Sequence, residues 1–205
     1  MRYKKVKEDL FSIYNSFLKY CVTRVSTIKR YNTRRIVFPQ SVMEHIGSTA
    51  LIAMVISDYF NSIGIKNNAE KVLRLAIVHD LDEVISGDIP HDAKYQMGSV
   101  SDVLRTSLDT LASATFNDMV SKIEAFKDVY FGVVKPYAEY KSRKSIESKI
   151  VKLADFLDVY LYSENEMAVG NTYIVPEYKN SYNRFIKLLK SVVEYEGSMD
   201  YRESE

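Results

Sequence analysis

The chain has 205 residues, of which 46% are hydrophobic and 27% are charged, and its net charge is only +1. This composition excludes global disorder, and the balance of 28 Lys and Arg against 27 Asp and Glu disfavours a strongly basic nucleic-acid-binding protein. The single cysteine, Cys21, cannot form an internal disulfide or a thiolate metal cage, which favours a reducing compartment. The longest apolar stretch, 50–56, is too short to cross a bilayer. We therefore expect a protein of the cytoplasm, or of the host cytoplasm if it is viral, with no membrane contact and no stable nucleic-acid partner.

The first half of the chain predicts three helices. An amphipathic helix is expected over about 5–27, because its apolar residues recur at helical spacing: Leu10, Ile13, Tyr14, Phe17, Leu18 and Cys21. A second helix, over about 41–60, is apolar on nearly every side after its first two turns, as expected of a central helix. Asn67 or Asn68 can cap a third helix, which runs to His79.

The second half of the chain predicts further helices and shows no recurring strand-type alternation. We expect one or two helices over 100–130, a long helix over 145–168 and a last helix over 177–195. Three residues are predicted to break helices: Gly87, Pro90 and Pro136. The apolar residues of the last helix fit either the core or a subunit contact: Phe185, Leu188, Leu189 and Val192. The sequence thus predicts an all-α fold, with one domain over 1–197 and a flexible tail over 198–205.

Two histidines and two aspartates lie on three separate predicted helices, each among apolar residues. His45 belongs to the second helix, His79 and Asp80 end the third, and Asp155 belongs to the long helix. A buried carboxylate without a partner is costly, and convergence on a divalent cation would satisfy all four residues. Mixed nitrogen and oxygen ligands suit a first-row transition metal better than Ca²⁺. Taken singly, His45 is better interpreted as a hydrogen-bonded core histidine and Asp155 as a cap or salt-bridge partner. Their joint occurrence on three separate apolar helices supports the metal site, so spacing alone leaves both interpretations open.

The order His45, His79-Asp80, Asp155 resembles the H…HD…D signature of the HD-domain metal-dependent phosphohydrolases. The block His79–Pro90, HDLDEVISGDIP, is more specific than the bare HD pair and is most similar to the bacterial HD-domain 5'-deoxynucleotidases. Further stretches match that family in order and spacing: Ile28–Tyr31, Ser41–His45, Lys94-Tyr95, Glu147–Asp155, Glu166 and Gly170-Asn171. The resemblance covers about residues 28–171 and implies an HD-domain helical bundle.

The resemblance also implies a reaction and a cofactor. The family hydrolyses deoxynucleoside 5'-monophosphates to deoxynucleoside and phosphate, so the expected partner is a small deoxynucleotide. By this resemblance one divalent transition metal ion is held by His45, His79, Asp80 and Asp155. Co²⁺ or Mn²⁺ is the family preference, and Zn²⁺, Fe²⁺ and Mg²⁺ are compatible with the same ligands. The family tendency is a homodimer or a larger homo-oligomer.

Two acidic residues near the HD pair are candidates for catalysis. Glu83 lies one helical turn after His79, so it can face the same cavity and position or deprotonate a water molecule. Asp88 resembles the family carboxylate that lies near the sugar and the leaving oxygen. Outside this motif, Glu83 would be interpreted as an exposed charge at a helix end, and Asp88 as a residue that stabilises a turn.

Three further residues are candidates for binding substrate. Arg30 matches a family arginine suited to clamping a phosphate, and Lys94 matches a position that adds positive charge near it. Either alone would be an ordinary surface cation. Tyr31 stands where the 5'-deoxynucleotidases usually carry Trp, an aromatic thought to exclude the ribose 2'-hydroxyl. His91 follows Asp88 closely and either contacts substrate or is a polar loop residue.

Two other functions compete with monophosphate hydrolysis. Some viral members of this small HD group remove triphosphate from dATP, and both the change at Tyr31 and the basic pair Arg34-Arg35 favour such a deoxynucleoside triphosphohydrolase. A catalytically inactive HD-fold binding module is the third hypothesis. The intact ligand set together with Glu83 and Asp88 disfavours it, because such a module does not need both carboxylates.

Overall fold

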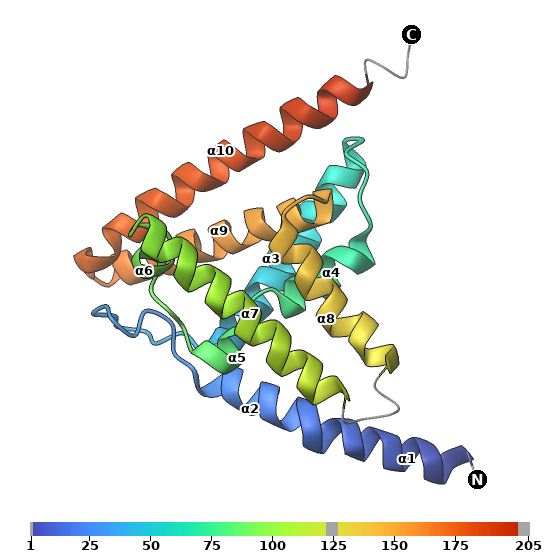
Figure 1. Ribbon diagram of the computed structural model, residues 1–205. Helices are drawn as coiled ribbons and strands as arrows, with labels where there is room; N and C mark the ends of the chain where they lie inside the picture. Colours follow the sequence, from blue (N-terminus) through green and yellow to red (C-terminus); the bar gives the residue numbers. More distant parts are fainter. Residues whose placement is uncertain (1, 122–126, 201–205) are drawn as a thin grey trace. The chain divides into compact units, whose positions relative to one another are not determined.

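A computed structural model describes residues 2–121 and 127–200, and these residues are helical apart from connecting turns and one isolated antiparallel bridge between Lys29 and Ser41 (Figure 1). The predicted all-α fold is therefore confirmed. The described residues form two compact units. The first unit comprises 2–33, 39–44, 80–121 and 127–137, and the second comprises 34–38, 45–79 and 138–200. Because the chain passes between the units several times, neither unit is a continuous stretch of sequence.

The first unit is built around one long helix, α7, and shorter helical segments. Its elements in chain order are α1 (Arg2–Ile13), the π-helical segment η1 (Tyr14–Leu18), α2 (Lys19–Thr27), α5 (Glu83–Ser86), α6 (His91–Tyr95), α7 (Ser99–Ser121) and the larger part of α8 (Lys127–Ser142). Helix α7 packs against α5, α6 and η1, and α2 packs against α5. The short helices α5 and α6 are separated by Gly87, whose φ of 72° ends α5 in a conformation that favours glycine.

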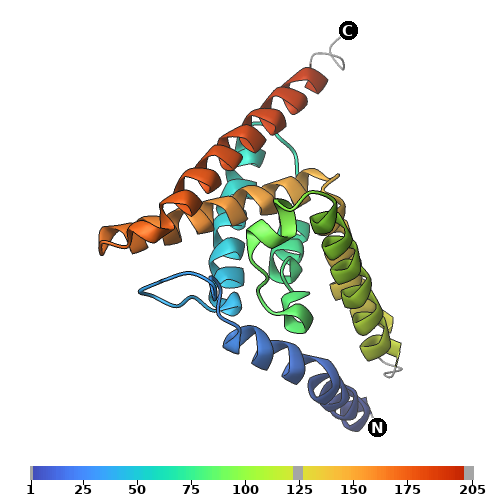
Figure 2. The same ribbon diagram turned by 60° about the vertical axis from the view of Figure 1, so that its left-hand side comes forward.

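The second unit contains α10, which with 26 residues is the longest of the described helices. Its elements are most of α3 (Val42–Ser62), α4 (Ala69–Val78), α9 (Ile146–Ala168), the 3-10 helix η3 (Thr172–Ile174) and α10 (Val175–Asp200). Helix α10 turns back along α9 after η3, and α4 packs on α9 (Figures 1 and 2). The core of this unit includes Ala53, Leu75, Ile150 and Leu153, all fully buried. The apolar residues of α10 that were open to either role pack in or against this core.

Side-chain caps fix where several helices begin. Asn68 accepts a hydrogen bond from the Lys71 N–H at 3.0 Å, which confirms one of the two predicted caps of α4. Ser41 and Glu44 bond each other reciprocally at the start of α3, the capping-box pattern. Ser145 caps α9 by accepting from the Ser148 N–H. These caps use orphan backbone donors at helix N-termini, so the sequence sets these boundaries locally.

The predicted first helix is correct in extent but only partly correct in its core. Phe17 and Cys21 are buried, whereas α1 contains no buried residue and Leu10 is 60% exposed. Helical spacing identifies an apolar face, but burial also requires another element to cover that face. Helix α3 was expected to be central because it is apolar on nearly every side, and the structure buries one side of it, including Val42, Ile46 and Ala53, while Leu51 and Val55 are exposed.

The predicted break at Pro136 is wrong. Pro136 lies inside α8, which continues to Ser142. A proline removes one hydrogen bond from a helix, and burial of neighbouring side chains can offset that loss. Val134, Tyr137 and Tyr140 recur every three residues along α8 and all are buried. Tertiary burial therefore overrides the local signal here.

The C-terminal end of the described chain is helical. Helix α10 extends to Asp200, five residues past the predicted end at about Tyr195, and residues 201–205 of the predicted tail lie outside the described residues. None of the described helices has the combination of length and hydropathy that a membrane span requires.

Candidate metal and substrate-binding site

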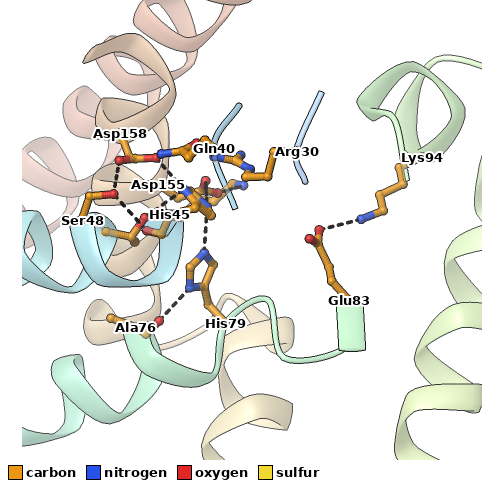
Figure 3. Close-up of polar contacts among 12 residues, drawn as sticks. Arg30, Gln40, His45, Ser48, Ala76, His79, Glu83, Lys94, Asp155 and Asp158 are labelled. Carbon is orange, nitrogen blue, oxygen red and sulfur yellow. Dashed lines mark hydrogen bonds and ion pairs between the residues drawn. The ribbon is translucent and has the colours of Figure 1, made fainter. Parts of the chain in front are cut away.

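The second unit brings two histidines and an aspartate together. His45 lies in the first turn of α3 and His79 directly follows α4, and both imidazoles are fully buried. Their Nε2 atoms are 3.2 Å apart, and a dashed line in Figure 3 marks this contact. Asp155, on α9, places its Oδ1 3.3 Å from the Nε2 of His45. Two other predicted metal ligands, one at the end of α4 and one on α9, therefore lie within 3.3 Å of the Nε2 of His45.

Hydrogen bonds fix which nitrogen of each ring carries the proton. The Nδ1 of His79 is 2.7 Å from the Ala76 carbonyl oxygen, and a carbonyl can only accept, so Nδ1 donates. The Nδ1 of His45 is 2.5 Å from the Oδ2 of Asp158, a carboxylate that accepts in the same way. In neutral imidazoles both Nε2 atoms then carry lone pairs, and these face each other. Two facing lone pairs repel unless a cation lies between them.

The donor set fits a divalent transition metal ion. Two ligands bound at about 2.1 Å to one cation lie about 3.0–3.4 Å apart at octahedral or tetrahedral angles, close to the separations among His45, His79 and Asp155. Asp80 follows His79 in the chain, where the chain leaves the second unit for the first. The donor chemistry is therefore that of a mixed imidazole and carboxylate metal centre.

Three residues near these ligands were not identified from the sequence. Asp158 and Ser48 follow two of the ligands by three residues on their helices, and the hydroxyl of Ser48 donates to the Oδ1 of Asp158. Lys152 pairs with the second oxygen of Asp155 at 2.5 Å. The partner of Lys152 is three residues away and could have been found from the i, i+3 spacing, whereas the contacts of Asp158 with His45 and Ser48 join distant segments and only folding reveals them.

The first unit buries Glu83 in a strongly charged setting. Glu83 opens α5 and is 5% exposed, which rules out the interpretation as an exposed charge. Its Oε1 lies 3.4 Å from the Nζ of Lys94, shown in Figure 3, and its buried Oε2 has no hydrogen-bond partner among the described residues. Burial, and then the nearby carboxylate of Asp80, raise the pKa of Glu83 to about 8, although Lys94 and Arg30 act to lower it. Such a carboxyl group can exchange a proton near neutral pH.

Lys94 lies on α6 and its ammonium group remains charged. Burial acts to lower the pKa of Lys94, but the surrounding carboxylates outweigh it and the pKa is raised. Glu83 is the largest of these contributions, and the other three come from Asp80, Asp82 and Asp88. Lys94 therefore supplies a fixed positive charge in a region of the first unit that is otherwise acidic.

Asp88 is tied to the segment that carries Arg30 and Tyr31. Its Oδ2 accepts a hydrogen bond from the Tyr31 N–H at 2.9 Å, and its carbonyl oxygen accepts from the Asn32 side chain at 3.0 Å. Tyr31 has a φ of 58°, an uncommon conformation for a residue with a side chain, and the Asp88 bond holds it there. The guanidinium of Arg30 lies over the Tyr31 ring, 5.2 Å from its centroid, and donates to Gln40. The first unit thus assembles all five predicted catalytic and substrate-binding residues on short helices and turns.

Comparison with known families and proteins shows the family of this chain. A family described as 5'-deoxynucleotidase YfbR-like matches residues 16–200. The chain belongs to this family. The 5'-deoxynucleotidase YfbR of Shigella boydii is 30% identical to it over 151 residues, which are 73% of this chain and 72% of that protein. The predicted relationship to the HD-domain 5'-deoxynucleotidases is confirmed, and the protein is a hydrolytic enzyme of this family.

Solved structures share the fold of this YfbR-like protein. An HD-domain phosphohydrolase from Listeria innocua is 20% identical, with a TM-score of 0.70 over 88% of this chain and 84% of that chain. DatZ, an HD phosphohydrolase of cyanophage S-2L solved with dA and one catalytic Zn²⁺ ion, is 19% identical, with a TM-score of 0.50 over 84% and 80% of the two chains. The predicted HD-domain architecture is therefore confirmed.

Three further residues were singled out in the sequence: Arg34, Arg35 and His91. In the second unit Arg34 pairs with Glu177 at 2.6 Å, and the guanidinium of Arg35 lies over the Tyr173 ring. Both cations of the pair that favoured a triphosphate substrate are thus held by neighbouring side chains. The backbone of His91 begins α6, but its side chain lies outside the described part of the structure.

Proposed function

We propose that this YfbR-like protein hydrolyses deoxynucleoside 5'-monophosphates to deoxynucleoside and phosphate, with the help of one divalent metal ion. The observation that carries the proposal is the facing Nε2 pair of His45 and His79 with Asp155 beside it, in a chain of a 5'-deoxynucleotidase family. Such a set of donors has no other evident use inside an apolar helical core. The proposed substrate follows from the family, and the proposed chemistry follows from the side chains.

His45, His79, Asp80 and Asp155 are the proposed ligands. A cation held there supplies Lewis-acid stabilisation of a phosphoryl oxygen and lowers the pKa of a bound water. Co²⁺ and Mn²⁺ are the proposed activating ions, and Zn²⁺ also suits two imidazoles with carboxylates. Lys152 forms an ion pair with the Oδ2 of Asp155, and its positive charge offsets part of the Asp155 charge in this buried setting.

Glu83 is the proposed general base. Water attacks phosphorus, the bond from phosphorus to the 5'-oxygen breaks, and the proton of the water passes to the carboxylate of Glu83. The departing 5'-oxygen takes up a proton and leaves as the nucleoside hydroxyl, and Asp88 is the proposed residue near this oxygen. The raised pKa of Glu83 suits this role, because a base of ordinary carboxylate pKa would hold the proton only weakly at neutral pH.

Arg30 and Lys94 are the proposed phosphate-binding residues, and Tyr31 is the proposed contact to the sugar. The half-buried ammonium group of Lys94 and the planar guanidinium of Arg30 carry positive charge and N–H groups that can donate hydrogen bonds to a phosphate. Tyr31 is held rigidly by the bond from its N–H to Asp88. A rigid ring can exclude a 2'-hydroxyl by contact, so replacing Tyr31 with Trp is expected to increase discrimination against ribonucleotides.

A substrate and metal panel tests the proposed function. The purified protein is stripped with a chelator, reloaded with Co²⁺, Mn²⁺, Zn²⁺ or Mg²⁺, and offered each dNMP, the matching NMP and each dNTP. We expect cation-dependent release of phosphate from dNMPs and weaker release from NMPs. Asp80→Ala is expected to lose bound metal and activity together, whereas the surface variant Asp58→Asn keeps both.

Each alternative function has its own outcome in that panel. Tripolyphosphate release from dNTPs with no activity on any dNMP would instead identify a deoxynucleoside triphosphohydrolase. Absence of bound metal in the native protein, together with no turnover after Co²⁺ addition, would identify an HD-fold binding module. Retention of both metal and activity in Asp80→Ala would contradict the proposed ligand set.

We also propose that the protein acts as a homodimer in the cytoplasm. Leu51, Val55 and Tyr59 form an exposed apolar face on α3, and exposed apolar clusters favour protein contacts. The free thiol of Cys21 fits a reducing compartment. Light scattering during size-exclusion chromatography measures the mass in solution, and Val55→Glu is expected to shift a dimer toward monomer.

A further inference from the structure

We infer that Asp158 is a positioning residue, which holds His45 in the tautomer and orientation that its Nε2 needs as a metal ligand. Ser48 in turn holds the carboxylate of Asp158. This inference rests on the proposed metal role of His45. It concerns a pair of residues that the HD pattern does not contain, because the pattern specifies ligands and not the residues behind them.

The contacts of Asp158 connect it to His45 with little freedom. Asp158 is 4% exposed on α9, and its Oδ2 lies 2.5 Å from the Nδ1 of His45. Its Oδ1 accepts a hydrogen bond from the hydroxyl of Ser48. The Oγ1 of Thr49 lies 3.4 Å from the same Nδ1, a longer contact than that of the carboxylate. Both oxygens of Asp158 are thus engaged, and its bond to the Nδ1 of His45, which is shorter than the Thr49 contact, fixes the ring.

Helical spacing explains why Asp158 reaches the back of a ligand. Asp155 and Asp158 are three residues apart on α9, so they lie on the same face of this helix. His45 and Ser48 have the same spacing on α3. Where these two faces meet, Asp155 lies at the Nε2 of His45 and Asp158 at the Nδ1 of the same ring. Helix α9 therefore contacts the imidazole of His45 at both ring nitrogens.

A carboxylate behind a histidine changes how that histidine binds metal. When the Nδ1–H donates to a carboxylate, the Nε2 keeps its lone pair and becomes a stronger donor, and the ring loses rotational freedom. Loss of such a partner typically weakens metal binding or activity by about 10–100-fold. His79 is held differently, because its Nδ1 bonds the backbone carbonyl of Ala76, which no side-chain substitution removes. Asp158 is therefore the part of this arrangement that mutagenesis can test.

The decisive variant is Asp158→Asn, which has almost the same shape without the charge. We expect its affinity for Co²⁺, followed by the visible absorption of the bound ion, to fall by about 10–100-fold. At saturating Co²⁺ most of the activity returns, unlike in a variant of the general base. Asp58→Asn, the same change at an exposed position of α3, is the matched control and keeps wild-type affinity.

A second readout needs neither metal nor substrate. In the chelator-treated protein, long-range ¹H–¹⁵N spectra of the histidine side chains report which ring nitrogen carries the proton. We expect the His45 signals of wild type to show a proton on Nδ1, and those of Asp158→Asn to show a mixture of tautomers. A carboxylate that serves only folding would leave these signals and the Co²⁺ affinity unchanged.

The outcomes separate this inference from the proposed function. The Co²⁺ affinity and the tautomer of His45 are measured without nucleotide. The role of Asp158 can therefore be tested even if the protein is inactive on every dNMP. Wild-type Co²⁺ affinity together with unchanged His45 signals in Asp158→Asn would overturn the inference. Should that variant not fold, Ser48→Ala decides in its place: we expect a Co²⁺ affinity several-fold weaker, and unchanged affinity and signals would overturn the inference equally.

Discussion

Glu83 of the first unit and Glu166 of the second are both buried glutamates on helices, but their carboxylates meet opposite surroundings. Glu166 accepts hydrogen bonds from the backbone N–H groups of Val37 and Phe38, at 2.8 and 2.6 Å, and from the side chain of Asn171 at 2.6 Å. Burial acts to raise the pKa of Glu166, but these donors outweigh it and hold the pKa below its usual value. The negative charge of Glu166 is therefore stabilised in the folded state.

Glu83 lies near two cations, Lys94 and Arg30, and near the carboxylates of Asp80 and Asp88. Burial and the charge of Asp80 raise the pKa of Glu83, and its Oε2 has no donor among the described residues. Burial alone therefore does not decide whether the pKa of a carboxylate is raised or lowered in the folded protein. Donors on both oxygens make Glu166 a structural connection between α9 and the segment 34–38. An oxygen without a donor, next to like charges, leaves Glu83 available for proton transfer.

The largest expected effect is on catalysis by Glu83→Gln. Gln keeps the size of the side chain but cannot accept a proton, so kcat for dNMP hydrolysis is expected to fall by about 10²–10⁴-fold. Metal content, measured by elemental analysis, stays near that of wild type, because Glu83 is not among the proposed ligands. A variant with near-normal kcat, or one that loses its metal, would contradict the assignment of Glu83 as general base.

The same substitution at Glu166 is expected to affect stability instead. Gln presents an NH₂ group where backbone N–H donors now find an oxygen, so at least one buried donor loses its acceptor. The free energy of unfolding, measured with urea on the chelator-treated protein, is expected to fall by about 2–3 kcal/mol. A loss below about 0.5 kcal/mol would show that the segment 34–38 is held by other contacts.

The pH dependence of stability has opposite signs for the two residues. Because the pKa of Glu83 is raised in the folded state from 4.5 to about 8, the folded protein retains a proton that the unfolded chain releases, and stability falls as pH rises through this window. Relative to Glu83→Gln, metal-free wild type is expected to lose about 1–2 kcal/mol between pH 6 and 8.

For Glu166 the lowered pKa acts the other way. Its stabilising contribution is present above pH 4.5 and is lost as pH falls through the lower folded-state pKa. Wild type therefore loses its advantage over Glu166→Gln on acidification. Urea titrations of both variants across pH 3.5–8 measure both slopes, and two slopes of the same sign would refute the comparison.

The smallest effect is expected at an exposed glutamate. Glu70 on α4 pairs with Arg74 at 2.8 Å, and both side chains are more than half exposed. Glu70→Gln is expected to change the free energy of unfolding by less than about 0.5 kcal/mol, because solvent and salt screen such a pair. The variant is the matched control for the two buried positions, and a larger effect there would mean that the Glu to Gln change itself is disruptive.

Much of the fold could be predicted from local signals. Asn68, Ser145 and Gly87 set helix ends through caps and backbone conformation, and these signals act within a few residues. Burial could not be predicted in the same way. Leu10 lies on an apolar stripe yet is exposed, and Pro136 breaks no helix, because both depend on what packs against them.

The sequence by itself determined the all-α class, the family pattern and the identity of the candidate ligands, because side-chain chemistry and helical spacing are local properties. Only the tertiary structure decided that the Nε2 of His45 lies within 3.3 Å of both the Nε2 of His79 and the Oδ1 of Asp155, and that Asp158 lies behind His45, 113 residues away in the chain. It also gave Glu83 and Glu166 their opposite charge preferences. A pKa depends on every donor and charge within a few ångströms, and those neighbours come together only when distant segments pack.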